Sequence, residues 1–81
     1  MNNGIFLKQL GGKVKAIRKA KGLSVRALAA MCGTDYSNLS RFENGQKNIH
    51  ILTLKLIAEN LDARLPELLT CRIKFLLRYS I

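Results

Sequence analysis

Residues 23–48 read LSVRALAAMCGTDYSNLSRFENGQKN and indicate two short helices joined by a turn. Ser24 is a favourable N-cap residue for a helix over 25–31, because its hydroxyl can accept a hydrogen bond from a free backbone N–H of the first turn. Asp35 is placed to cap a second helix over 36–43, and a glycine lies in the turn between the two helices. Two short helices joined by a glycine-containing turn predict a helix-turn-helix unit.

Apolar residues at helical spacing on both sides of this unit predict further helices. The first covers roughly residues 6–21, where Gly11 and Gly12 each cost about 1 kcal/mol relative to alanine. These glycines predict frayed first turns or a helix that starts after them. A later helix carries a broad apolar stripe formed by Ile51, Leu54, Ile57, Ala58 and Leu61. Because Pro66 suits the first turn of a short closing helix, the sequence predicts an all-α fold, a compact five-helix bundle.

Length and charge limit the classes of protein to which the chain can belong. Its 81 residues leave room for one compact domain and exclude a multidomain enzyme. Lys and Arg total 14 whereas Asp and Glu total 5, which gives a net charge of +9. No acidic residue precedes Asp35, so the N-terminal half carries most of the excess. This charge favours a polyanionic partner such as nucleic acid, although such runs also serve simply as solvated surface.

The stretch at 23–48 resembles the Cro/repressor-type (XRE-like) helix-turn-helix family of small DNA-binding transcriptional regulators. In that family a Leu-Ser opening, small residues in the first helix, a Gly turn and an aliphatic-Ser-x-apolar-Glu-x-Gly ending recur together. Residues 39–45, LSRFENG, match the ending, and the resemblance extends over residues 10–70. It implies a lambda-repressor-like domain that binds double-stranded DNA and places the second helix of the unit in the major groove.

The resemblance also implies roles for individual residues. Base readout falls to Tyr36, Ser37 and Arg41. Contacts with phosphate, or secondary contacts, fall to Arg26, Asn38, Ser40, Asn44 and Lys47. Arg41 is suited to two hydrogen bonds with guanine, and Arg18 and Glu43 stand where the family commonly has a structural ion pair. Val25 occupies the position of a glutamine that contacts phosphate in many members, and Arg26 can contact the phosphate instead.

The chain offers no group of residues suited to metal binding or catalysis. Cys32, Cys71 and His50 are too few for the four ligands of a structural zinc site, and both cysteines lie among apolar residues, where a buried reduced thiol is expected. No nucleophile-base pair and no phosphate-cradling glycine loop accompany them. No apolar stretch reaches the length of a membrane span or of a secretion signal. We therefore expect a cytoplasmic protein that has no cofactor or metal and is not an enzyme.

The C-terminal residues 71–81 form a tail that follows a DNA-binding domain at 1–70. The odd-numbered positions of the tail are all apolar or aromatic, which favours a β-strand. A helical extension is the alternative, because neither glycine nor proline separates the tail from the preceding helix. Both geometries leave apolar surface uncovered, which predicts that the tail joins two copies of the chain in a homodimer.

A symmetric dimer would place its two recognition helices about 34 Å apart, which is one turn of DNA. We therefore expect a sequence-specific transcriptional regulator, a dimeric repressor or controller that reads a pseudo-palindromic operator through the helix at 35–44. The alternative is an antitoxin that binds a cognate toxin protein and autoregulates its operon. A free-standing domain of this size suits both functions, so the sequence alone does not separate them.

Overall fold

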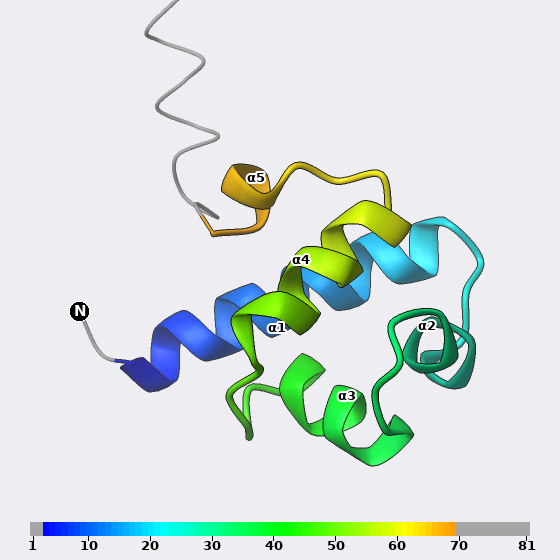
Figure 1. Cartoon of the computed structure of the whole chain (residues 1–81). Coiled ribbons are helices and arrows are strands. Elements are labelled where there is room, and N and C mark those ends of the chain that lie inside the picture. Colours follow the sequence, from blue (N-terminus) through cyan, green and yellow to red (C-terminus); the bar gives the residue numbers. More distant parts are fainter. Residues whose placement is uncertain (1–2, 70–81) are drawn as a thin grey trace, which may run out of the picture.

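The computed structural model describes residues 3–69, in which the chain folds as packed helices (Figure 1). The helices are α1 (Asn3–Ala20), α2 (Val25–Met31), α3 (Tyr36–Glu43), α4 (Ile51–Asn60) and α5 (Leu65–Leu69). All regular secondary structure in this range is α-helical, which confirms the predicted class. The strand or helix predicted for the tail at 71–81 lies outside the described residues.

The helix-turn-helix consists of α2 and α3, which begin where the sequence predicts. Ser24 Oγ accepts a hydrogen bond from the backbone N–H of Ala27 at 3.0 Å and so caps α2. Asp35 has the extended backbone of an N-cap residue, but its side chain makes no capping hydrogen bond to α3. The capping role predicted for the Asp35 carboxylate is therefore wrong. The hydroxyl of Ser37 donates to it at 2.5 Å and competes with the backbone N–H groups for its oxygens.

The core draws aliphatic side chains and one aromatic ring from all five helices. Its members are Leu10, Val14, Leu28, Ala29, Cys32, Leu39, Phe42, Leu54, Ile57, Ala58, Leu61 and Leu68. On α3 only the side of Leu39 and Phe42 is apolar and buried, which leaves the opposite side free for contacts outside the domain. The stripe predicted for α4 is buried except at Ile51, which is 57% exposed. Ile51 is the first residue of α4 and lies one turn before Leu54, which is the first buried residue of the stripe.

Helix α1 continues unbroken through Gly11 and Gly12 and begins at Asn3, so the prediction that it starts after the glycines is wrong. Gly11 is buried where α1 crosses the end of α3. A Cβ atom at Gly11 would overlap the carbonyl oxygen of Phe42 and would lie 2.9 Å from that of Glu43. Glycine therefore permits an approach of the two helices that any larger residue would prevent, and their packing offsets its low helix propensity.

Candidate nucleic-acid interface

The side of α3 that faces away from the core carries the three residues predicted to read bases. Tyr36, Ser37 and Arg41 are all exposed, whereas Leu39 and Phe42 have no exposed surface. Ser37 and Arg41 lie four positions apart on the helix, so they share one face and are separated by one turn. This face is accessible over the length of the helix.

Arg26 and Tyr36 connect the beginnings of α2 and α3. The guanidinium carbon of Arg26 lies 4.3 Å from the centroid of the Tyr36 ring, within the range of a cation–π interaction. One face of the ring is therefore covered by a cation. The sequence predicts a phosphate contact for Arg26 and base readout for Tyr36. It does not predict that they meet, because positions ten apart on two different helices carry no pairing signal.

The loop after α3 folds back against that helix. Lys47 Nζ donates a hydrogen bond to Asn38 Oδ1 at 2.9 Å. Asn44 ends α3 by directing its backbone N–H at the carbonyl oxygens of Ser40 and Arg41, each at 3.2 Å. Lys47 and Asn44 are exposed, whereas Asn38 and Ser40 are half-buried. The structure thus brings Lys47, a predicted phosphate contact, against α3.

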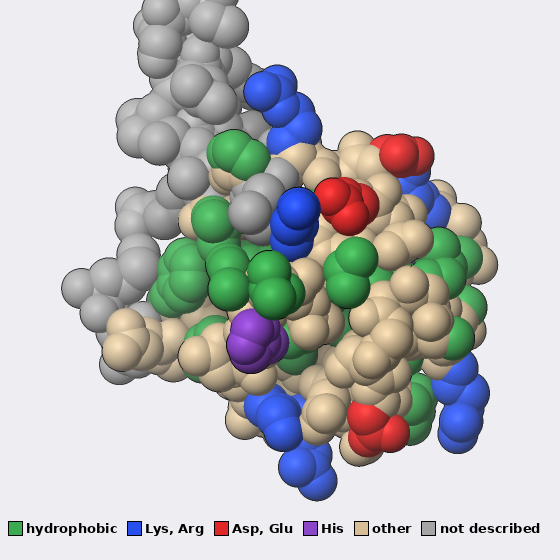
Figure 2. Space-filling view, viewed as in Figure 1, with side chains coloured by type: hydrophobic (Ala, Val, Ile, Leu, Met, Phe, Trp, Pro, Cys, Tyr) green, Lys and Arg blue, Asp and Glu red, His purple; other side chains and the backbone are tan. Residues whose placement is uncertain are grey.

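Exposed charge on this surface is mostly positive. The charged residues of segment 24–48 that reach solvent are Arg26, Asp35, Arg41 and Lys47, three cations and one acid. Figure 2 shows Lys and Arg side chains to both sides of an acidic one along the lower edge of the molecule, where α2 and α3 lie in Figure 1. The sequence predicts only a capping role for Asp35. Its isolation among cations was visible in the sequence and could have marked it as a residue of the surface.

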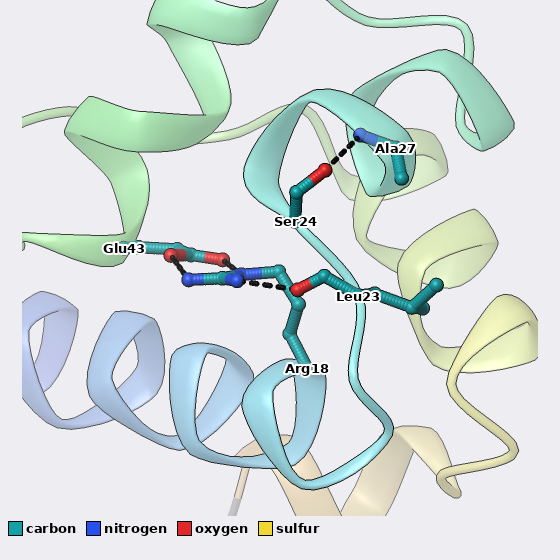
Figure 3. Close-up of polar contacts among 5 residues, drawn as sticks. All are labelled: Arg18, Leu23, Ser24, Ala27 and Glu43. Atoms are coloured by element: carbon teal, nitrogen blue, oxygen red, sulfur yellow. Dashed lines mark hydrogen bonds and ion pairs between the residues drawn. The ribbon is translucent and has the colours of Figure 1, made fainter.

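A buried ion pair attaches the end of α3 to α1 (Figure 3). Arg18 Nε and Nη2 donate to the two carboxylate oxygens of Glu43 at 2.7 and 3.0 Å. Arg18 Nη1 donates to the carbonyl oxygen of Leu23 at 2.6 Å. The side chains of Arg18 and Glu43 are 6% and 2% exposed, respectively. Because water cannot solvate either charge there, each depends on these hydrogen bonds for compensation. The pair holds α1, the segment entering α2 and the last turn of α3 together, which fixes the direction of the exposed face of α3.

Among residues 3–69, the remaining polar groups do not gather into a metal site, and the described cysteine is not an activated one. Residues 3–69 contain no cluster of three or more His, Cys, Asp or Glu side chains that could hold a metal ion. Burial raises the pKa of the Cys32 thiol, and a hydrogen bond from Asn60 opposes that shift only in part. A thiol with a raised pKa is a poor nucleophile at neutral pH. None of the described helices combines the length and the apolarity needed to cross a bilayer.

Comparison with known proteins gives concordant matches. Residues 14–68 match a family model described as helix-turn-helix. Control protein C.MunI from Mycoplasma sp is 36% identical over 61 residues, which cover 74% of this chain and 82% of that protein. The crystal structure of the restriction-modification controller protein C.AhdI from Aeromonas hydrophila has a TM-score of 0.73 at 35% identity, and the match covers 76% of this chain and 94% of that one.

A further solved structure shows the same arrangement at lower identity. The clp gene regulator ClgR from Corynebacterium glutamicum has a TM-score of 0.76 at 26% identity, over 79% of this chain and 68% of that one. The family model spans residues 14–68, so it includes all of α3 and both members of the buried ion pair, Arg18 and Glu43.

Proposed function

We propose that this chain, which belongs to the helix-turn-helix family of DNA-binding transcriptional regulators, is a dimeric repressor or controller that reads a pseudo-palindromic operator through α3. The exposed polar face of α3 carries the proposal, because Ser37 and Arg41 lie one turn apart on it. Arg26 and Lys47, on the adjoining segments, would contact phosphates and supply most of the affinity. The side chains of α3 would select the sequence.

Two observations support the finer parts of the proposal. The similarity to C.MunI and C.AhdI, both described as control proteins, favours a controller over an antitoxin. On α4, Ile51, Leu52 and Leu56 are 57%, 62% and 40% exposed, which is a large apolar surface for so small a domain. Figure 2 shows hydrophobic side chains gathered near the N-terminal end of α4. A second copy packed there would bury them and build the two-fold symmetry that a pseudo-palindrome requires.

Selection from random duplex DNA at near-physiological salt tests the proposal directly. Recovery of an inverted repeat with half-sites about one helical turn apart would support a dimeric reader. Salt-sensitive retention without any enriched motif would contradict it, because phosphate contacts alone bind all sequences alike. That result would favour the antitoxin function, for which capture of a toxin protein is then the measurement.

Replacing Arg41 with alanine should relax base preference at one position in each half-site. A bidentate contact with guanine is worth about 1–3 kcal/mol of discrimination, so the advantage of the preferred base over the others should fall by roughly 5- to 150-fold. Lys47→Ala should instead weaken binding to all sequences and lower the salt dependence by about one phosphate contact. Lys19→Ala is the matched control for Lys47→Ala, because it also removes one exposed positive charge, but from α1, which the proposal does not place against DNA. Identical selected motifs for the wild type and Arg41→Ala would remove Arg41 from base readout.

The contact between Arg26 and Tyr36 should contribute to affinity by holding the guanidinium in place. Tyr36→Leu is expected to weaken DNA binding several-fold, since an exposed cation–π contact is worth about 0.5–1 kcal/mol and the freed Arg26 must be ordered on binding. Tyr36→Phe keeps the ring and should retain most of the affinity. Binding would be measured by fluorescence anisotropy with the selected operator. Equal losses in the two variants would show that the hydroxyl, and not the ring face, matters.

A further inference from the structure

We propose that Asp35 and Ser37 form a pair of hydrogen-bond acceptors that selects cytosine or adenine at the base facing the start of α3. The inference rests on the proposed function and adds to it a residue, Asp35, and a class of base. It follows from the direction of one hydrogen bond and from the position of one carboxylate.

The direction of the hydrogen bond between the two residues is fixed by chemistry. A carboxylate has no proton to donate, so the Ser37 hydroxyl donates to Asp35 Oδ2, at 2.5 Å. The single proton of the hydroxyl is therefore committed within the protein. The lone pairs of Ser37 and those of the carboxylate remain, and both are acceptors. Any group that contacts this pair through a hydrogen bond must be a donor.

The position of the Asp35 carboxylate determines which bases can lie opposite it. Asp35 is exposed, makes no capping hydrogen bond to α3 and forms no ion pair among residues 3–69. In a helix-turn-helix complex the N-terminal residues of the recognition helix lie against base edges. A carboxylate placed against a base edge that offers no hydrogen-bond donor would lose its hydration without gaining a hydrogen bond in return. The donors that the major groove offers are the amino groups of cytosine and adenine, whereas guanine and thymine present acceptors at the same place.

Further along α3 the hydrogen-bond character reverses. Asn38 Oδ1 already accepts from Lys47 at 2.9 Å, which leaves the amide N–H groups of Asn38 as the side-chain groups that can engage DNA. Arg41 carries donors only. The recognition face therefore presents acceptors at its start and donors about one turn later. We expect a half-site in which cytosine or adenine faces Asp35 and Ser37, and guanine faces Arg41.

The experiment compares the DNA selected by the wild type with that selected by Asp35→Asn and Ser37→Ala, at one salt concentration. Asn has a similar shape and is a good N-cap residue, so the fold is retained; circular dichroism checks it. The wild type should select cytosine or adenine at one position of the half-site. Asp35→Asn should reduce the discrimination against guanine and thymine there by about 5- to 150-fold, because the new amide can donate to them. Ser37→Ala should weaken the preference at that same position.

Glu59→Gln is the matched control, since it removes one exposed acidic charge from α4. It should leave the selected motif unchanged while slightly raising affinity for all DNA. A wild-type motif that Asp35→Asn leaves unchanged, with affinity raised uniformly as in Glu59→Gln, would overturn the inference while the proposed function stands. A wild type that selects no motif would overturn both.

Discussion

Replacing Gly11 with alanine should destabilise the domain, although alanine is the better helix former. The added Cβ would overlap the carbonyl oxygen of Phe42 and lie 2.9 Å from that of Glu43, and both obstacles are backbone atoms that no side-chain rotation can move. Overpacking of this kind costs about 1–3 kcal/mol and sometimes more, against roughly 1 kcal/mol gained in helix propensity. Because rigid backbone is involved, we expect a net loss of about 2 kcal/mol or more.

Thermal unfolding followed by circular dichroism would measure the effect. A loss of that size corresponds to a fall in Tm of about 8–16 °C for a domain of this length. Gly12→Ala provides the matched control, because Gly12 is exposed and a Cβ atom added there would meet no other atom within 4 Å. That variant should be stabilised by about 0.5–1 kcal/mol. If both alanine variants gained stability alike, the close approach of α1 to the end of α3 would be refuted.

The contrast between these glycines shows what sequence reasoning could and could not predict. Helix ends depend on neighbouring residues, so Ser24 and the start of α2 were predictable from local chemistry. The value of Gly11 depends on a backbone segment more than thirty positions away, and periodicity carries no information about that neighbour. The need for glycine at position 45 also depends on a distant segment, although its place at the end of the LSRFENG stretch is evident from the sequence. Its backbone has φ of +75°, and a Cβ there would lie 2.8 Å from the Cα of Lys8.

On the candidate interface, the sequence predicts which side of α3 is exposed but not which side chains contact one another. The spacing of Leu39 and Phe42 shows which side of α3 is buried, and the exposure of Ser37 and Arg41 follows from it. The contact of Arg26 with the Tyr36 ring depends on how α2 and α3 cross, which one sequence does not specify. For Asp35, N-cap preference gave a sufficient explanation of the residue. The structure shows instead that its carboxylate makes no capping hydrogen bond and accepts one from the Ser37 hydroxyl.

Replacing Glu43 with alanine should cause the largest loss of stability of any change considered. The Arg18 guanidinium would stay buried with the carbonyl oxygen of Leu23 as its remaining partner, at 2.6 Å. Removing one member of a buried pair costs about 3–5 kcal/mol, because the charge left behind has lost its water as well as its partner. A domain this small has a free energy of unfolding near the lower end of the usual range, about 5 kcal/mol. We therefore expect a substantial unfolded fraction at 25 °C, measurable by urea denaturation.

A double variant separates the cost of an unpaired charge from the value of the pair itself. Arg18→Met combined with Glu43→Leu removes both charges and keeps apolar volume, so it should be more stable than Glu43→Ala alone. Recovery should stay incomplete, since the carbonyl oxygen of Leu23 loses its donor. Lys21→Ala is the control for an exposed pair: Lys21 Nζ lies 3.6 Å from Asp62 Oδ2, and those side chains are 38% and 86% exposed. It should cost no more than about 1 kcal/mol. A loss in Glu43→Ala as small as in Lys21→Ala would mean that burial does not make the Arg18 pair structurally essential.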